Sequence, residues 1–390
     1  MTKMTKTVEE INEKIRNGDA VVLTAMQMKE YVAQNGAKKA AQEIDVVTTG
    51  TFGVMCSSGA FLNFGHSEPP IKMQKVWLND VEAYTGIAAV DAYIGATQMS
   101  ESQSFSYGGG HVIEDLVSGK EVQLKATSYG TDCYPRKSIE TWVGINDLNQ
   151  ATMLNPRNCY QKYNCAVNAS DRSIWTYMGN LLPNVGNATY AGAGEINPLC
   201  NDPTYRTIGV GTRIFLGGGT GYVIGEGTQH DPQGGFGTLS VRGDMKKMSK
   251  EFLRGASLKG YGTSLYVGIG VPIPILDEGL AKSTAIRDSE IFTEVFDYGT
   301  GHRRKPVLGN VSYEQLKSGS IELNGKQVST RPLGIPAKAR QITEELKKRI
   351  EAGTFLLSCP VERLSLASES KVLNEKSASV CTDCKPRNRT

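Results

Sequence analysis

Three glycine-rich segments constrain the fold of this chain more than any other feature of its sequence. They are SYGGGH (106–111), LGGGTGYVIGEGTQHDPQGGFG (216–237) and YVGIGVP (266–272), in a chain of 390 residues that holds 43 glycines. Apolar, strand-like runs flank each segment, which is typical of loops inside a folded domain and not of a low-complexity linker. We therefore expect closely packed strands joined by loops with exposed backbone.

Helix-like and strand-like segments alternate along the chain. Helices are predicted at 7–17, 24–36, 111–117, 244–253 and 336–352, and strands at 20–24, 43–50, 121–128, 141–146, 238–242 and 264–271, with a hairpin at 321–328. No proline-rich or serine-rich linker separates them, so the sequence predicts one large α/β body, mixed α/β or α+β, over residues 1–367. The polar, unpatterned residues 368–390 are predicted to form a flexible tail.

The distribution of charged and apolar residues argues against nucleic acid and membranes as partners. Lysine and arginine total 43 against 40 acidic residues, and no basic block is interleaved with aromatic residues, so nucleic acid is not an expected partner. The first residues are charged and helix-periodic, without the apolar core of a signal peptide, and no run approaches the roughly 18 apolar residues of a spanning helix. We expect a cytoplasmic protein that does not enter a membrane.

Common cofactor motifs are absent from the sequence. No glycine pair continues into a complete dinucleotide fingerprint, and no P-loop occurs. The chain has eight cysteines, but its one C-x-x-C motif, Cys381 to Cys384, has no second pair at zinc-site spacing. In a large chain without secretion signals, this number of cysteines indicates thiol chemistry or metal binding more than a disulfide framework.

Two cysteines stand out by their position. Cys56, in GVMCSSG, and Cys133, in TDCYPRK, each lie just past the carboxyl end of a predicted strand, where open α/β sheets bind ligands. Backbone N–H groups after Cys56 and the cation of Arg136 near Cys133 can favour a thiolate, whereas Asp132 opposes it beside Cys133. Local context alone leaves a reactive thiol and a packed small side chain equally open for both residues.

Long motifs around these cysteines resemble a known family. The runs IDVVTTGTFGVMCSSGAFLNFGHSEPPIKM, ATSYGTDCYPRK, NPRNCYQKYN and INPLCNDPTYRTIGVGTRIFLGGGTGYVIGEGTQH are similar to the homocysteine biosynthesis family of anaerobes and methanogens, the L-aspartate semialdehyde sulfurtransferases. The resemblance covers roughly residues 7–365. It implies an enzyme that makes L-homocysteine from L-aspartate semialdehyde, a sulfide source and a reductant, with Cys56 and Cys133 as the sulfur-carrying cysteines.

The electron count of that reaction suits a pair of thiols. Replacing the aldehyde oxygen by sulfur gives a thioaldehyde, and reaching the CH₂SH group takes two further electrons. Two thiols that close to a disulfide release two electrons. We therefore hypothesise that one cysteine carries a persulfide or adds to the carbonyl, that the pair supplies the electrons, and that a separate ferredoxin-like donor reopens the disulfide. Homo-oligomer formation is left open.

The substrate implied by the resemblance needs complementary side chains. Arg136, Arg206 and Arg213 are candidates for its carboxylate, because a guanidinium can bind one through two parallel hydrogen bonds. His66 and His230 are candidates for proton transfer at the carbonyl, since histidine titrates near neutral pH. Arginine and histidine side chains in such positions have a structural role more often than a role in substrate binding. Candidates for the ammonium group are Asn63, Glu68 and Asp231.

Two alternative functions use the same residues. Three or more thiolates can converge on an iron–sulfur cluster that receives the sulfide at an open iron. The cysteines considered for such a cluster are Cys56, Cys133, Cys159, Cys165 and Cys200. A protein of another class, a non-catalytic sulfur carrier or amino-acid sensor, can use the same pocket without releasing homocysteine.

Overall fold

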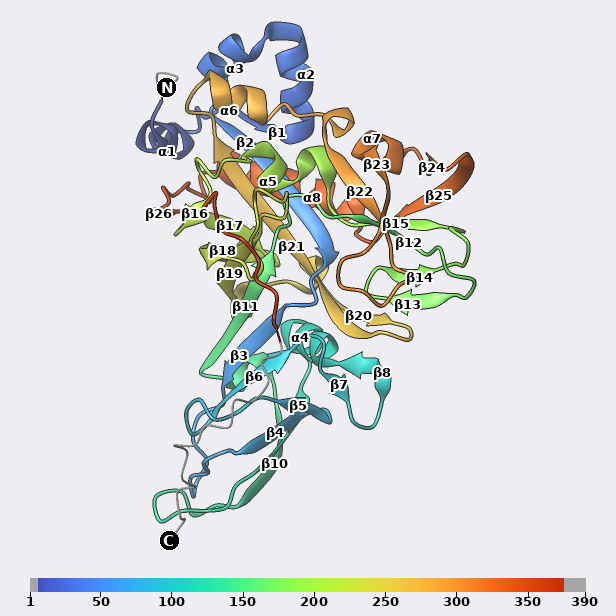
Figure 1. Ribbon diagram of the computed structural model, residues 1–390. Helices are drawn as coiled ribbons and strands as arrows, with labels where there is room; N and C mark the ends of the chain where they lie inside the picture. Colours follow the sequence, from blue (N-terminus) through green and yellow to red (C-terminus); the bar gives the residue numbers. More distant parts are fainter. Residues whose placement is uncertain (1–5, 375–390) are drawn as a thin grey trace, which may run out of the picture.

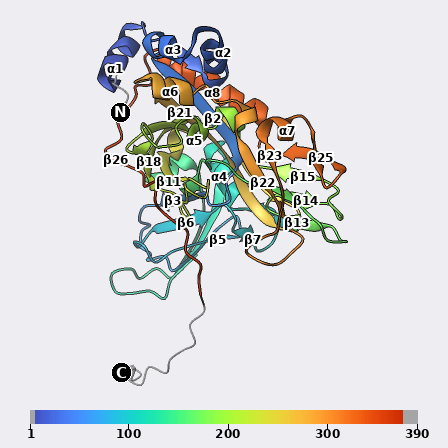
Figure 2. The ribbon, with the colours of Figure 1, turned by 45° about the horizontal axis from the view of Figure 1, so that its top comes forward.

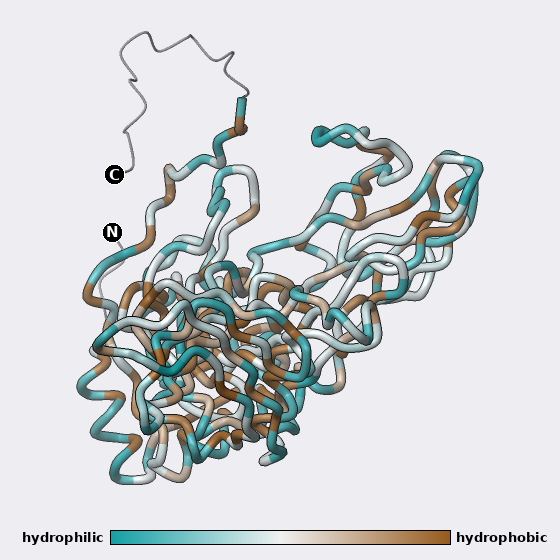
Figure 3. Tube along the Cα trace, turned by 90° about the horizontal axis from the view of Figure 1, so that it is seen from below, coloured by the Kyte–Doolittle hydropathy of each residue, from teal (hydrophilic) through white to brown (hydrophobic). Residues whose placement is uncertain are grey.

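The computed structural model describes residues 6–374 of the chain. Three large β-sheets form its framework, and most helices pack at one end of the first sheet (Figure 1). Apolar segments gather in the interior of the compact part (Figure 3). The predicted mixed α/β fold class is confirmed. Among the described residues, no helix has the length and apolar character needed to cross a membrane.

A ten-stranded central sheet runs through the middle of the molecule. Its first two strands are parallel and all its other pairs are antiparallel. The strands, in spatial order, are β1 (Val22–Thr24), β2 (Val46–Val54), β21 (Gly262–Pro274), β17 (Arg213–Leu216), β18 (Gly219–Glu226), β19 (Leu239–Asp244), β11 (Gln150–Asn158), β3 (Gly59–Asn63) and β6 (Asp91–Gly95), while β20 (Leu253–Leu258) pairs with β21.

Helices cover the end of the central sheet where β1 and β2 lie. They are α1 (Val8–Asn17), α2 (Ala25–Asn35), α3 (Ala37–Glu43), α6 (Glu278–Ser283) and α8 (Pro336–Glu351). Glycines in the strands allow α8 to approach closely: a side chain at Gly50 would lie 2.8 Å from the carbonyl oxygen of Ala339, and one at Gly270 would lie 3.0 Å from Ile342. This packing explains part of the high glycine content, because a larger residue there would displace the helix.

A second sheet, which we call the distal sheet, projects from the central sheet at the opposite end (Figures 1 and 2). Its strands, in order, are β10 (Ser138–Val143), β9 (Val122–Thr127), β4 (Lys75–Leu78), β5 (Val81–Ala83), β7 (Met99–Ser100) and β8 (Ser104–Gly108). Helix α4 (Gly109–Val117) follows β8 and packs on β20 and β21. One hydrophobic cluster contains Val76 and Leu124 of the distal sheet together with Val241 and Leu265 of the central sheet, so the two sheets share a core.

A third, mixed sheet lies beside the central sheet and is called here the lateral sheet. Its strands, in order, are β23 (Val307–Ser312), β22 (Phe292–Asp297), β12 (Cys165–Val167), β15 (Ala188–Tyr190), β25 (Lys326–Pro332) and β24 (Ser320–Leu323). The short helix α7 (Tyr313–Lys317) and the two-stranded hairpin of β13 (Ile174–Thr176) and β14 (Gly179–Leu181) accompany it. This sheet has its own small hydrophobic cluster, centred on residues such as Val295 and Tyr313.

Most of the predicted elements are confirmed, and one prediction is wrong. The predicted helix at 244–253 is instead two 3-10 turns, Met245–Lys247 and Lys250–Phe252, followed directly by β20. Asp244 and Ser249 each cap the backbone of a new short turn, which breaks a continuous helix. Helix α3 was not predicted from the sequence. The strand predicted at 141–146 is β10, which begins and ends three residues earlier, at Ser138 and Val143. Cys381 and Cys384 lie outside the described residues.

Candidate active site

Cys56 lies where the chain leaves β2 and turns toward β3. The turn is closed by a hydrogen bond from the N–H of Ser58 to the carbonyl of Met55, and the Cys56 side chain is half-buried. Burial raises the pKa of the Cys56 thiol, while a hydrogen bond from Ser264 and the positive charge of Arg157 oppose that rise. The thiol is therefore largely protonated at neutral pH, but Ser264 and Arg157 are among the groups placed to stabilise its thiolate.

Cys56 opens into a cavity of about 320 Å³ between the central and lateral sheets. The lining is largely aromatic with a few polar groups, which is the composition expected of a small-molecule site. The lining residues besides Cys56 are Val54, Arg157, Tyr160, Tyr163, Tyr177, Met178, Ala191, Gln229, Tyr261 and Leu333. The Cys56 sulfur thus faces several hydroxyl groups and a guanidinium.

Arg157, on β11, is the cation in this cavity. Its Nη1 donates a hydrogen bond to Gln229, its guanidinium lies 6.0 Å from the centre of the Phe236 ring, and its Nε is buried without a hydrogen-bond partner among the described residues. A half-buried guanidinium with a buried, unused N–H donor can bind a carboxylate at low cost. Sequence reasoning missed Arg157, although it lies in the NPRNCYQKYN motif that carries the family resemblance.

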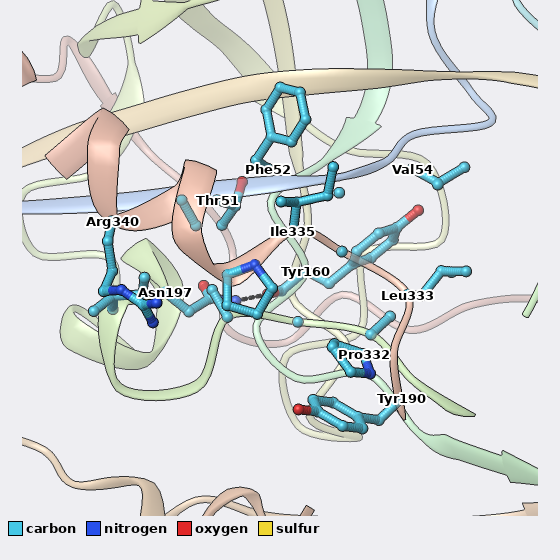
Figure 4. Close-up of a pocket in the computed structure, with 18 of the residues that line it drawn as sticks. Thr51, Phe52, Val54, Tyr160, Tyr190, Asn197, Pro332, Leu333, Ile335 and Arg340 are labelled. Carbon is cyan, nitrogen blue, oxygen red and sulfur yellow. Dashed lines mark hydrogen bonds between the residues drawn. The ribbon is translucent and has the colours of Figure 1, made fainter. Parts of the chain in front are cut away.

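A second, smaller cavity of about 80 Å³ adjoins the first and shares Val54, Tyr160, Ala191 and Leu333 with it (Figure 4). Its walls are mainly apolar. Three charged residues line it: Glu195 pairs with Lys29, Lys317 pairs with Asp288, and Arg340 is exposed. The larger cavity is therefore the better place for a substrate that carries both an ammonium and a carboxylate.

Cys133 lies in a different part of the molecule. It is exposed in the turn between β9 and β10, in the distal sheet, and the next residue, Tyr134, stacks on His66 with 5.9 Å between ring centres. His66 follows β3 at the end away from Cys56, and the five residues of β3 alone span about 13 Å. Arg136 is near Cys133 and donates to the carbonyl of Ser138. The structure therefore groups Cys133 with His66 and Arg136 and does not bring them to the Cys56 cavity.

The rule that ligands bind at the carboxyl ends of strands in open α/β sheets therefore does not bring Cys56 and Cys133 together here, and their shared role in catalysis stays a prediction. That rule holds for parallel strands of one sheet. Here β2 pairs antiparallel with β21 in the central sheet, and β9 belongs to the distal sheet.

The other predicted substrate-binding residues have partners elsewhere. Arg206 forms a double hydrogen bond with the carboxylate of Asp277, at 3.0 and 2.5 Å. Arg213 donates to the carbonyl of Leu356 at 3.3 Å, and its guanidinium lies 6.0 Å from the Phe355 ring. His230 is buried, with Nδ1 accepting from the N–H of Thr238 and Nε2 placed to donate to the carbonyl of Ser365. The residues proposed for the ammonium group, Asn63, Glu68 and Asp231, also lie outside the Cys56 cavity lining.

The cysteines considered for an iron–sulfur cluster do not form a metal site among the described residues. Cys159, Cys165 and Cys200 are buried, and Cys133 lies in another sheet from Cys56. Over residues 6–374, no group of three or more histidine, cysteine, aspartate or glutamate side chains is placed to hold a metal ion. The arrangement of these residues does not fit the iron–sulfur alternative.

Comparison with known proteins gives consistent matches along the chain. Residues 20–357 match the family described as "Homocysteine biosynthesis enzyme, sulfur-incorporation". A protein of Methanosarcina acetivorans named L-aspartate semialdehyde sulfurtransferase is 57% identical over 373 residues, which cover 96% of this chain and 75% of the relative. A protein of the same name from Methanocaldococcus jannaschii is 54% identical, with 93% and 74% covered. No solved structure matches the chain.

Proposed function

Because this chain belongs to the family of sulfur-incorporating homocysteine biosynthesis enzymes, we propose that it transfers sulfur to L-aspartate semialdehyde in the cavity beside Cys56. The observation that carries this assignment is the pairing of a half-buried thiol with the half-buried guanidinium of Arg157, whose Nε is buried without a hydrogen-bond partner among the described residues, in one cavity. The two groups match the two ends of the substrate, an aldehyde that reacts with sulfur nucleophiles and an amino-acid carboxylate.

The cavity suits the rest of the substrate. Arg157 would bind the carboxylate, and the faces of Tyr160, Tyr163 and Tyr261 would attract the ammonium group. The carboxylate would also complete the hydrogen bonding of the Arg157 Nε. In this orientation the aldehyde carbon lies toward Cys56.

The proposed reaction balances with two protein thiols. Sulfide adds to the carbonyl, and loss of water leaves a thioaldehyde. The Cys56 thiolate attacks the thioaldehyde sulfur and the carbon takes up a proton, giving a mixed disulfide between Cys56 and homocysteine. A second thiol attacks the Cys56 sulfur and releases homocysteine, so the two electrons gained by the substrate come from closing a protein disulfide. An external donor, which we propose to be a ferredoxin-like protein, reduces that disulfide.

For the second thiol we propose Cys133 of another copy of the chain. Cys133 is exposed, and the distal sheet that carries it shares a buried core with the central sheet. Bringing Cys133 to Cys56 within one chain would disrupt that core, whereas a second copy can present its β9–β10 turn to the cavity without such a change. Exposed apolar side chains on the distal sheet, among them Trp142, support contact with another protein surface.

One assay tests the function. Purified protein is incubated anaerobically with L-aspartate semialdehyde, sulfide and a dithiol reductant, and L-homocysteine is measured. We expect product from the wild type and none above background from Cys56→Ala, with Cys359→Ala, a change at an exposed cysteine away from the cavity, as the matched control. A wild-type protein that binds the semialdehyde but forms no homocysteine would instead identify a sulfur carrier or sensor.

A further inference from the structure

Three tyrosine hydroxyls form a hydrogen-bonded group that begins in the wall of the Cys56 cavity. Tyr163 and Tyr177 line the cavity, and the Tyr163 hydroxyl donates to the Tyr177 hydroxyl at 3.0 Å. The hydroxyl of Tyr177 is also 2.7 Å from that of Tyr298, and the side-chain amide of Asn164 donates to Tyr298 at 2.9 Å. These contacts join a cavity wall to a residue outside the cavity.

The amide of Asn164 donates to the Tyr298 oxygen and leaves the Tyr298 hydrogen to find an acceptor. Either hydroxyl of the Tyr177–Tyr298 pair can be the donor, and we take Tyr298 as the donor because Tyr177 is the hydroxyl acceptor within its reach among the described residues. Tyr177 then accepts from both Tyr163 and Tyr298. Its own hydrogen has no protein acceptor among the described residues and is free to donate to a molecule in the cavity.

Separate elements hold the three rings in place. Tyr177 lies in the turn between β13 and β14, Tyr163 precedes β12, and Tyr298 follows β22. The Tyr163 backbone is fixed by the hydroxyl of Thr293, which donates to its carbonyl at 2.8 Å. Packing alone does not explain three hydroxyl groups at this place, because phenylalanine rings would fill the same space without burying polar atoms.

We infer that Tyr177 is the catalytic proton donor to the substrate oxygen, an inference that rests on the sulfur-transfer function proposed above. Addition of sulfide leaves a hydroxyl and a thiol on one carbon. When the C–O bond breaks, the hydroxyl leaves as water with the Tyr177 proton, and the S–H bond breaks to form the C=S bond. The proton released from sulfur returns to Tyr177, so the step needs no oxidant or reductant.

Tyr163 and Tyr298 act as positioning residues in this step. Each can donate a hydrogen bond to the Tyr177 oxygen, so both stabilise the phenolate formed when Tyr177 gives up its proton. Burial keeps the pKa of Tyr177 well above its ordinary value, which leaves the phenol protonated at neutral pH before the reaction. Hydrogen bonds from Tyr163 and Tyr298 then lower the free energy of the Tyr177 phenolate as it forms.

The test compares phenylalanine variants of the three tyrosines in the homocysteine assay. We expect Tyr177→Phe to lower kcat about a hundredfold with little change in KM for the semialdehyde, the size typical of removing a general acid. Tyr298→Phe and Tyr163→Phe should lower kcat about tenfold and change the solvent isotope effect on kcat, which a merely structural change would leave alone. Tyr205→Phe is the matched control, because it removes a buried hydroxyl that has no hydrogen-bond partner within residues 6–374 and lies outside the cavity.

The rate of Cys56 alkylation shows in each variant whether the site is still folded. If Tyr177→Phe does not fold, Tyr298→Phe decides the question, since its ring lies outside the cavity. A folded Tyr177→Phe variant, or in its absence a folded Tyr298→Phe variant, with kcat within twofold of the wild type would overturn the inference. Absence of homocysteine from the wild type would instead count against the proposed function.

Discussion

The hydroxyl of Ser264 donates a hydrogen bond of 3.2 Å to the sulfur of Cys56. The contact follows from strand register: Val54 pairs with Tyr266 in the β2–β21 ladder, so two residues further along Cys56 comes opposite Ser264. The position of the thiol is therefore set by the longest strand pairing in the central sheet and not by a mobile loop.

This contact predicts the pH dependence of thiol reactivity. Burial raises the pKa of Cys56, so its alkylation by iodoacetamide should increase with pH through a midpoint above the ordinary cysteine value of about 8.5. Ser264→Ala removes a donor to the thiolate and should move that midpoint higher. Mass spectrometry of the Cys56 peptide measures the rate, and Ser257→Ala, an exposed serine on β20, is the control. A midpoint that falls in Ser264→Ala would contradict the assigned role.

Arg157 is predicted to determine binding of the semialdehyde. Arg157→Ala removes a charged hydrogen-bonding partner of the carboxylate, and we expect KM to rise about 10- to 100-fold. The loss of its positive charge should also raise the pKa of Cys56, because that charge favours the thiolate. Arg157→Lys should bind better than alanine but worse than the wild type, since lysine cannot form two parallel hydrogen bonds. Arg242→Ala, at an exposed position on β19, should match the wild type in steady-state kinetics.

Local signals in the sequence predicted several elements well. Thr24 and Gln27 form a capping box at the start of α2, Pro336 lies in the first turn of α8, and Asn324-Gly325 adopts the positive φ angles of a tight hairpin turn. Each signal acts over a few residues, so it can be recognised without knowledge of the rest of the chain.

The position of Arg157 in the cavity and the separation of Cys56 from Cys133 depend on contacts between residues that are far apart in the sequence. Arg157 lies in the cavity wall because β11 pairs with both β3 and β19 in the central sheet. Cys133 lies away from the cavity because β9 pairs with β4 and β10 in the distal sheet. The register of these pairs depends on the folded core, which local periodicity does not encode. Cys56 lines a cavity. Its catalytic role and that of Cys133 stay predictions, as does a role in substrate binding for Arg136, Arg206, Arg213, His66 and His230.

Arg206 offers a direct test of a structural role against a substrate role. The Asp277 side chain is fully buried and caps α6, so removing its partner in Arg206→Ala should lower the free energy of unfolding by about 2–4 kcal/mol without a specific rise in KM. Arg206 lowers the pKa of Asp277, so the pair stabilises the fold above the ordinary aspartate value of about 3.9, and this contribution is lost as pH falls through the lower folded value.

Urea unfolding at neutral and acidic pH measures this difference. The gap in stability between the wild type and Arg206→Ala should shrink as the pH falls toward 3. Arg206→Lys is the matched variant and should recover part of the lost stability, because it keeps the charge. A stable Arg206→Ala protein with a large increase in KM for the semialdehyde would favour the substrate role instead.

The proposed transfer of electrons between copies can be tested by mixing two inactive variants. Cys56→Ala retains Cys133, and Cys133→Ala retains Cys56. If the two thiols meet across a symmetric pair of chains, each mixed pair contains one complete site and one site that lacks both cysteines. Random exchange in an equal mixture makes half of the pairs mixed, and half of the sites in these are complete. Activity should then recover to about a quarter of the wild-type value.

Thiols that meet within a single chain predict a different result. The mixture would stay inactive, and oxidation of the wild type would give a disulfide inside one chain and not a covalent dimer on a non-reducing gel. A mixture of the wild type with the double variant Cys56→Ala/Cys133→Ala provides the control for exchange of chains. If the thiols meet within one chain, each wild-type chain keeps its complete site in a mixed pair, so an equal mixture should show half the activity of the same total amount of wild-type protein. If they meet between chains, the same mixture should fall to about a quarter, because only the pairs of two wild-type chains stay active.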